Sequence, residues 1–95
     1  MYARVVRFTD ASPDRIAEIA ARVQEDDGPP PGVRTSGMKL LFDESQSTAV
    51  FIGFFETEAE LRESSEILGQ MDSSETPGTR ASVDLCEVKV EAGAN

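Results

Sequence analysis

Residues 38–57, MKLLFDESQSTAVFIGFFET, decide the fold of this chain. The stretch predicts two strands joined by a polar turn at residues 43–47, followed by a helix that starts at Thr57. The second strand, residues 49–55 (AVFIGFF), carries no polar side chain. A strand with one face in water usually alternates apolar and polar residues, so we expect this strand to be covered on both faces.

On the amino-terminal side of this hairpin, a strand is predicted over residues 2–9 and a helix after it. Ser12 is a suitable helix cap, and Pro13 suits the first helical position. The helix is expected to end before Gly28, and the prolines at residues 29–31 predict a stiff surface loop. Its apolar stripe consists of Ile16, Ile19, Ala20 and Val23.

On the carboxyl-terminal side, Thr57 and Glu60 form a capping box for a second helix. The predicted inward stripe of this helix is Leu61, Ser64, Ser65, Leu68 and Met71, and the helix is expected to end near Met71. The two serines either let the helix approach the sheet closely or line a cavity. A final strand is predicted over residues 82–91, and it contains the single cysteine, Cys86.

The predicted order is strand, helix, strand, strand, helix, strand, within one domain that covers residues 1–95. Right-handed crossovers and a short central hairpin favour an α+β, ferredoxin-like fold. We expect a four-stranded antiparallel sheet in the order 4-1-3-2, with both helices on one face. The other face would expose alternate residues of the third strand together with Ala3 and Val5. Covering it predicts a homodimer, sheet against sheet, about a two-fold axis.

Composition excludes several classes of function. A net charge of −9 argues against a nucleic-acid partner and against anionic membrane surfaces. No run approaches the ~20 apolar residues of a membrane span. The chain has no histidine, which removes His-dependent nucleophilic catalysis and the commonest metal ligand, so neither a metal nor another cofactor is expected. Cys86 cannot form an internal disulfide, so we expect a small buried side chain and a cytoplasmic protein.

Two groups of residues are candidates for a ligand site. Arg4 shares a strand face with Tyr2, and either its head reaches solvent or a carboxylate, or it anchors an acidic or phenolic ligand at the mouth of a pocket. Phe51 and Phe55 share a face of the third strand with Gly53 between them. Gly53 removes a side chain in mid-sheet, so this face is either plain core packing or a site for a small apolar ligand.

Four segments carry a resemblance to a known family: residues 1–4 (MYAR), the hairpin, residues 55–61 (FETEAEL) and residues 86–91 (CEVKVE). Together the chain resembles the dimeric α+β barrel proteins of the antibiotic-biosynthesis-monooxygenase type. The resemblance implies a homodimer, a ligand between sheet and helices, and cofactor-independent oxidation of phenols or quinols. By register, Gly53, Phe55 and Ser64 stand where enzymatic members carry Glu, Trp and His, so groups able to transfer protons are replaced there.

Three functional hypotheses follow. The first is a monooxygenase-like protein that needs no cofactor and acts on a small aromatic or quinol-type substrate, with Arg4 and Tyr2 polarising the substrate oxygen. The second is a non-catalytic homodimeric module that binds a small ligand or simply associates. A third hypothesis, an adaptor that uses the acidic second helix, rests on the charge run from Glu56 to Thr76 alone.

Overall fold

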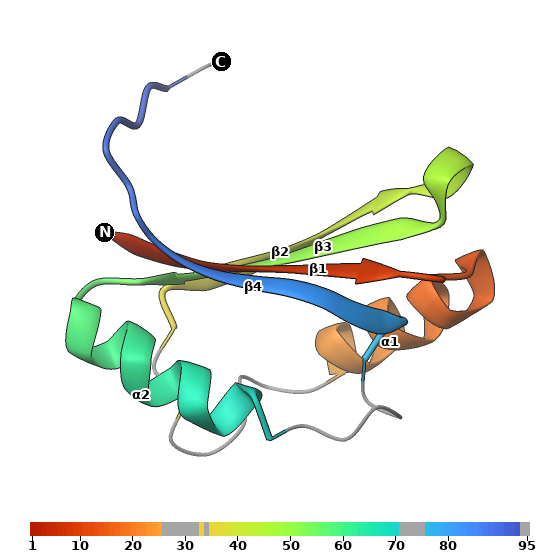
Figure 1. Ribbon diagram of the computed structural model, residues 1–95, viewed down its shortest axis with the longest axis horizontal. Helices are drawn as coiled ribbons and strands as arrows, with labels where there is room; N and C mark the ends of the chain where they lie inside the picture. Colours follow the sequence, from red (N-terminus) through yellow and green to blue (C-terminus); the bar gives the residue numbers. More distant parts are fainter. Residues whose placement is uncertain (26–32, 34, 71–75, 94–95) are drawn as a thin grey trace.

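The computed structural model describes residues 1–25, 33, 35–70 and 76–93. They form an α+β fold in which two helices lie on one face of a four-stranded antiparallel sheet (Figure 1). The elements are β1 (Tyr2–Thr9), α1 (Pro13–Glu25), β2 (Gly37–Asp43), the short 3-10 helix η1 (Glu44–Gln46), β3 (Thr48–Phe55), α2 (Glu58–Leu68) and β4 (Thr79–Glu87). The predicted α+β class and antiparallel sheet are confirmed, and the arrangement is compatible with a ferredoxin-like fold.

The strands lie side by side in the order β2-β3-β1-β4. In this order β1 and β3 are the central strands, with Val6 of β1 directly opposite Phe51 of β3 and Val83 of β4. Residues that oppose each other across antiparallel strands point to the same face. The register therefore assigns every side chain of the sheet either to the helix-covered face or to the open face.

Both helices begin where their capping residues predict. The Ser12 hydroxyl accepts a hydrogen bond from the backbone N–H of Arg15 (3.2 Å), and the Thr57 hydroxyl accepts one from Glu60 (3.1 Å). Each cap uses one backbone donor that the first helical turn leaves free. The predicted end of the second helix near Met71 was wrong: α2 ends at Leu68, because Gly69 caps it, its N–H donating to the carbonyl oxygens of Ser65 and Ile67. The predicted loop at Gly28 and residues 29–31 lies outside the described residues.

The core lies between the sheet and the helices as two clusters. The first consists of Val6, Phe8, Ala11 and Ala49, with Ile16, Leu40, Phe42 and Phe51 packed against it. The second consists of Val33, Phe55 and Leu61, with Tyr2 and Leu68 packed against it. α1 contributes to the first cluster and α2 to the second, so each helix covers a different end of the same sheet face.

The prediction for the last strand was wrong at both ends. β4 runs over Thr79–Glu87 rather than residues 82–91, because Glu87 is already opposite Tyr2, the first residue of β1. Beyond it, the Val88 N–H donates a hydrogen bond to the Met1 carbonyl oxygen (2.9 Å). The prediction of a buried Cys86 was also wrong: the thiol is exposed, because β4 is an edge strand and Cys86 opposes Ala3 on its open face.

Candidate functional site

A row of four residues crosses the helix-covered face of the sheet between the two core clusters. Arg4 of β1 opposes Gly53 of β3 on one side and Leu85 of β4 on the other, and Gly53 opposes Met38 of β2. The row therefore reads Met38, Gly53, Arg4, Leu85. Arg4 is the one charged member of this row, and it lies on a central strand.

Arg4 is buried, with only 8% of its surface exposed. Its Nε donates a hydrogen bond to the hydroxyl of Ser65 on α2 (3.2 Å). Among the described residues the ion pairs are formed by Arg15, Arg62 and Lys89, and none involves Arg4. A guanidinium carries five donors in a planar fork, and Ser65 uses only one of them. The structure therefore buries a cation for which its described part offers no anionic partner.

The electrostatic surroundings of Arg4 add to this imbalance. Burial lowers the pKa of the Arg4 guanidinium, and the positive charge of Arg80 on β4 lowers it further. Arg80 opposes Phe8 at the far end of β1, and its charge still acts on Arg4 along the same face. Because a buried cation is costly unless it is paired, two cations acting on one region favour the binding of an anion there.

Tyr2 and Phe55 close one side of the site. They oppose each other across β1 and β3, and both belong to the core cluster beneath α2. Phe55 is fully buried and Tyr2 is half-buried. Ser64, which is also buried, precedes the Ser65 that binds Arg4. The structure thus gathers Tyr2, Arg4, Gly53, Phe55 and Ser64 at the α2 end of the sheet, whereas Phe51 packs in the other cluster.

The space above Gly53 is filled by an aromatic ring. A Cβ placed on Gly53 would lie 3.3 Å from Cε2 of Phe55 and 3.5 Å from its Cζ. The Phe55 ring therefore leans along its own strand over the glycine. This contact supports the packing interpretation of Gly53, because the Phe55 ring occupies the space next to the glycine.

Both ends of the row are open to solvent. Leu85 is 40% exposed and Met38 is 37% exposed, although both side chains lie on the helix-covered face. Val83, the next residue of β4 on this face, is exposed as well. The β4 edge therefore presents exposed apolar side chains next to the buried Arg4.

Two residues of the site were missed by sequence reasoning. Ser65 was placed in the inward stripe of α2, but nothing in the sequence distinguished it from Ser64 as the partner of Arg4. Arg80 lies before the predicted start of the last strand, so its position beside β1 was not foreseen. The position of Arg80 could have been predicted only from the correct register of β4 against β1.

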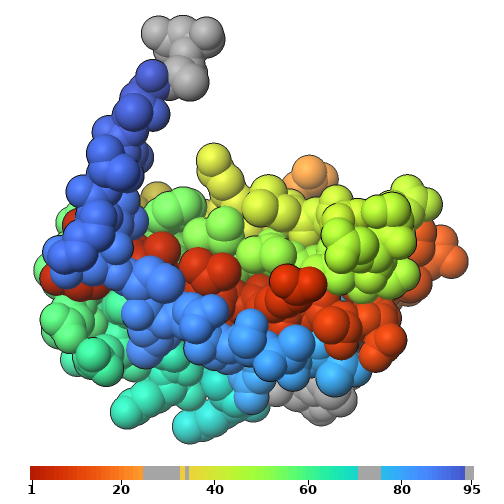
Figure 2. Space-filling view, turned by 45° about the horizontal axis from the view of Figure 1, so that its top comes forward, coloured from red at the N-terminus to blue at the C-terminus, as the bar shows by residue number. Residues whose placement is uncertain are grey.

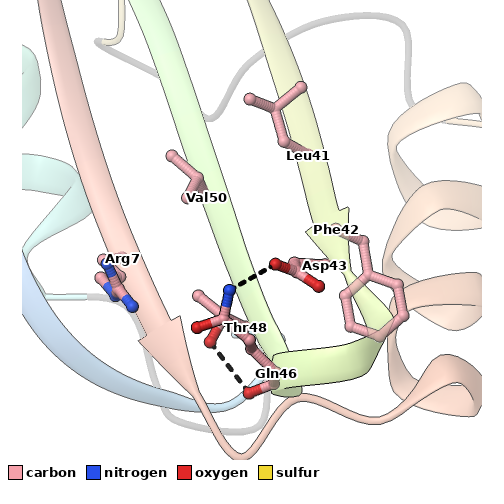
Figure 3. Close-up of a pocket in the computed structure, with 7 residues that line it drawn as sticks. All are labelled: Arg7, Leu41, Phe42, Asp43, Gln46, Thr48 and Val50. Carbon is pink, nitrogen blue, oxygen red and sulfur yellow. Dashed lines mark hydrogen bonds between the residues drawn. The ribbon is translucent and has the colours of Figure 1, made fainter.

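The opposite face of the sheet carries a shallow depression of about 260 Å³ at the hairpin end. It lies between Arg7, Leu41 and Val50, while Phe42 points away toward α1 (Figure 3). Asp43 at its edge accepts hydrogen bonds from the side chains of Ser45 and Gln46, both at 2.7 Å. These bonds lower the pKa of the Asp43 carboxyl, and they hold the side chains of the hairpin turn together.

The described residues contain no group of three or more His, Cys, Asp or Glu side chains that could hold a metal ion. Of the helices in the described ranges, none has the length and apolar content needed to cross a membrane. Comparison of the chain with family models, with curated proteins and with solved structures finds no match. The resemblance noted above therefore stays a prediction.

Proposed function

We propose that this chain is a homodimeric module that binds a small anionic ligand, a carboxylate or a phenolate, at Arg4. The observation that carries the proposal is the buried Arg4 guanidinium, which has one hydrogen bond to Ser65 and no acidic partner among the described residues. Planar, two-pronged recognition of an oxyanion is the chemistry that a guanidinium performs best.

The neighbours of Arg4 favour an aromatic body for this ligand. Leu85 and Met38 give the row exposed apolar ends, and the half-buried Tyr2 provides aromatic surface on the α2 side. A pocket that is mostly apolar with one charged group fixes both the affinity and the orientation of a small ligand. Small aromatic acids and phenolates combine these two properties.

Calorimetric titration with benzoate tests the proposal, and benzyl alcohol serves as its uncharged counterpart. We expect benzoate to bind the wild-type protein and benzyl alcohol to bind much more weakly. Arg4→Met should remove the binding of benzoate. Arg22→Met, which removes an exposed arginine on α1, should preserve it. Equal binding of benzoate to wild type and to Arg4→Met would overturn the proposal.

The homodimer is the second part of the proposal, and the open sheet face supports it. Val5, Val50, Ile52 and Phe54 lie in the middle of that face and are only half-buried within one chain. Arg7, Lys39, Asp43 and Asp84 lie around them on the same face. An apolar centre with a polar rim is the usual composition of an interface between subunits. A reducing cytoplasm is the compartment we propose, because Cys86 is a free thiol and the chain has no second cysteine for a disulfide.

Oxidation of a quinol or phenol by molecular oxygen is the second candidate function. Tyr2 lies two residues from Arg4 on the same strand face, so a bound phenolate would have both a cation and a phenolic hydroxyl within reach. Oxygen-uptake measurements with a panel of hydroquinones test this activity, with Arg4→Met as the comparison. If a ligand binds but no oxygen is consumed, the proposed ligand site stands and the proposed oxidation is wrong.

A further inference from the structure

The edge strand β4 is uncovered on the side of the ligand site, because α2 packs against the central strands β1 and β3. All nine residues of β4 are exposed, and Figure 2 shows the strand, in blue, at the surface of the molecule. The register places three of its side chains on the helix-covered face beside the site: Leu85 opposite Arg4, Val83 opposite Val6, and Arg80 opposite Phe8. A short exposed apolar stretch therefore separates two arginines.

An irregularity in β4 brings Arg80 to this face. Ser82 opposes Arg7, but the register then shifts so that Arg80 opposes Phe8. In an uninterrupted ladder Ala81 would oppose Phe8, and Arg80 would belong to the open face, because successive side chains of a strand alternate. An extra residue in a strand re-aims a side chain, and such bulges are frequent next to functional sites. The shift thus places a second cation on the same face as the first.

We propose that Arg80 is a second anchor of the ligand site, and that the ligand is a rigid aromatic dianion with one anionic group at each end. The proposal rests on the anion site proposed above at Arg4, and it adds the residue that selects the class of ligand. In this arrangement one anionic group pairs with Arg4 and the other with Arg80. The aromatic ring between them lies against Leu85 and Val83, which supply exposed apolar contact.

The charges along β4 favour a second anionic group at Arg80. Arg80 is exposed and belongs to none of the ion pairs formed among the described residues. Burial, and after it the positive charge of Arg80, lower the pKa of the Arg4 guanidinium, so the two cations act on the same region. Glu87, the acid of β4 opposite Tyr2 on this face, is paired with Lys89 (3.2 Å). A dianion would compensate both arginines, whereas a monoanion leaves one of them uncompensated.

The spacing of the two arginines favours a long dianion over a compact one. Arg4 and Phe8 are four residues apart on β1, which is about 13 Å of extended strand, and Arg80 opposes Phe8. Two long side chains cover part of this distance, and a ligand with its anionic groups at opposite ends of a ring covers the remainder. Terephthalate has this form. Phthalate carries the same charge, but its adjacent carboxylates contact one arginine at a time.

Calorimetric titration with terephthalate tests the proposal, and its matched control is terephthalamate, in which a neutral amide replaces one carboxylate. We expect the wild-type protein to bind terephthalate about fivefold more tightly than terephthalamate, the gain that an exposed ion pair can supply. Arg80→Met should remove this preference and retain the binding of terephthalamate. The two ligands and the two proteins form a double-mutant cycle, which isolates the contact at Arg80. Arg22→Met, at an exposed arginine of α1, should leave the preference unchanged.

The outcomes separate this proposal from the anion site on which it rests. If the wild-type protein shows no preference for terephthalate, or if Arg80→Met retains the preference, the role of Arg80 is overturned and benzoate binding at Arg4 still stands. If phthalate binds as tightly as terephthalate, charge alone accounts for the gain and the spanning arrangement is overturned. A wild-type protein that binds neither benzoate nor terephthalate would overturn both proposals.

Discussion

Arg4 is the residue on which the functional account depends. A cation buried without an acidic partner lowers stability, and such a cost is tolerated where a ligand supplies the missing charge. We therefore expect Arg4→Met to leave the free energy of unfolding unchanged or to raise it by about 1 kcal/mol, while anion binding is lost. Urea denaturation measures this, with the exposed Arg22→Met on α1 as control. A loss of more than about 2 kcal/mol would assign Arg4 a structural role instead.

Asp43 gives a second prediction for a single residue. The hydroxyl of Ser45 and the amide of Gln46 donate to its carboxylate and lower its pKa, Ser45 having the larger effect. The pKa of Asp43 in the folded protein lies below its ordinary value. The two hydrogen bonds therefore stabilise the folded protein above the ordinary pKa, and this stabilisation is lost as the pH falls through the folded pKa. Ser45→Ala should raise the pKa of Asp43, as measured by the NMR titration of its side-chain carbonyl carbon. An unchanged midpoint would show that the Ser45 bond is absent in solution.

The candidate site could be predicted only in part from the sequence, as Arg4 and its partner Ser65 show. Alternation along β1 placed Arg4 and Tyr2 on one face, because strand periodicity is a local property. The identity of the partner of Arg4 could not be predicted, since it depends on the rotation of α2 over the sheet. That rotation brings Ser65 to Nε of Arg4, and no spacing in the sequence encodes it.

Among the elements, α2 depends on its amino-terminal cap. The Thr57 hydroxyl accepts the hydrogen bond from the Glu60 N–H, so Thr57→Ala should cost about 1 kcal/mol of stability. Thr57→Ser retains the hydroxyl and should restore most of that loss. Thermal unfolding of the two variants measures the difference. Equal melting temperatures for the Ala and Ser variants would contradict the capping role.

The start of β4 depends on a close approach of two backbone segments at Gly78. A Cβ on Gly78 would collide with the Thr9 carbonyl oxygen and lie 3.2 Å from the Ala11 nitrogen. Neither atom can move without disturbing the end of β1, so we expect Gly78→Ala to cost about 2 kcal/mol. At Gly37 a Cβ meets nothing within 4 Å, which makes Gly37→Ala the matched control. Equal stability of the two variants in urea would contradict this account of the β4 start.

Element boundaries were predictable where local chemistry sets them. β1 and the starts of α1 and α2 follow from strand alternation and from capping residues. β4 was misplaced because its limits depend on β1, its one partner in the described sheet: pairing begins with Thr79 opposite Thr9 and ends with Glu87 opposite Tyr2. The apolar alternation of Val88 and Val90 continues past that limit, so the pattern alone predicted a longer strand.

For the whole molecule, the central claim is that two chains associate through the open faces of their sheets. Ile52 lies on that face of the central strand β3, opposite Val5. A lysine at this position would place a charge in the middle of the interface, where an unpaired charge is costly. Ile52→Lys should therefore separate the dimer while the fold is retained, which circular dichroism can verify.

Sedimentation equilibrium of the wild-type chain and of Ile52→Lys at micromolar concentration tests this claim most directly. We predict the mass of two chains for the wild type, the mass of one chain for Ile52→Lys, and an unchanged dimer for the surface control Val23→Lys. A wild-type chain that sediments with the mass of one chain, or an Ile52→Lys variant that remains a dimer, would contradict the account.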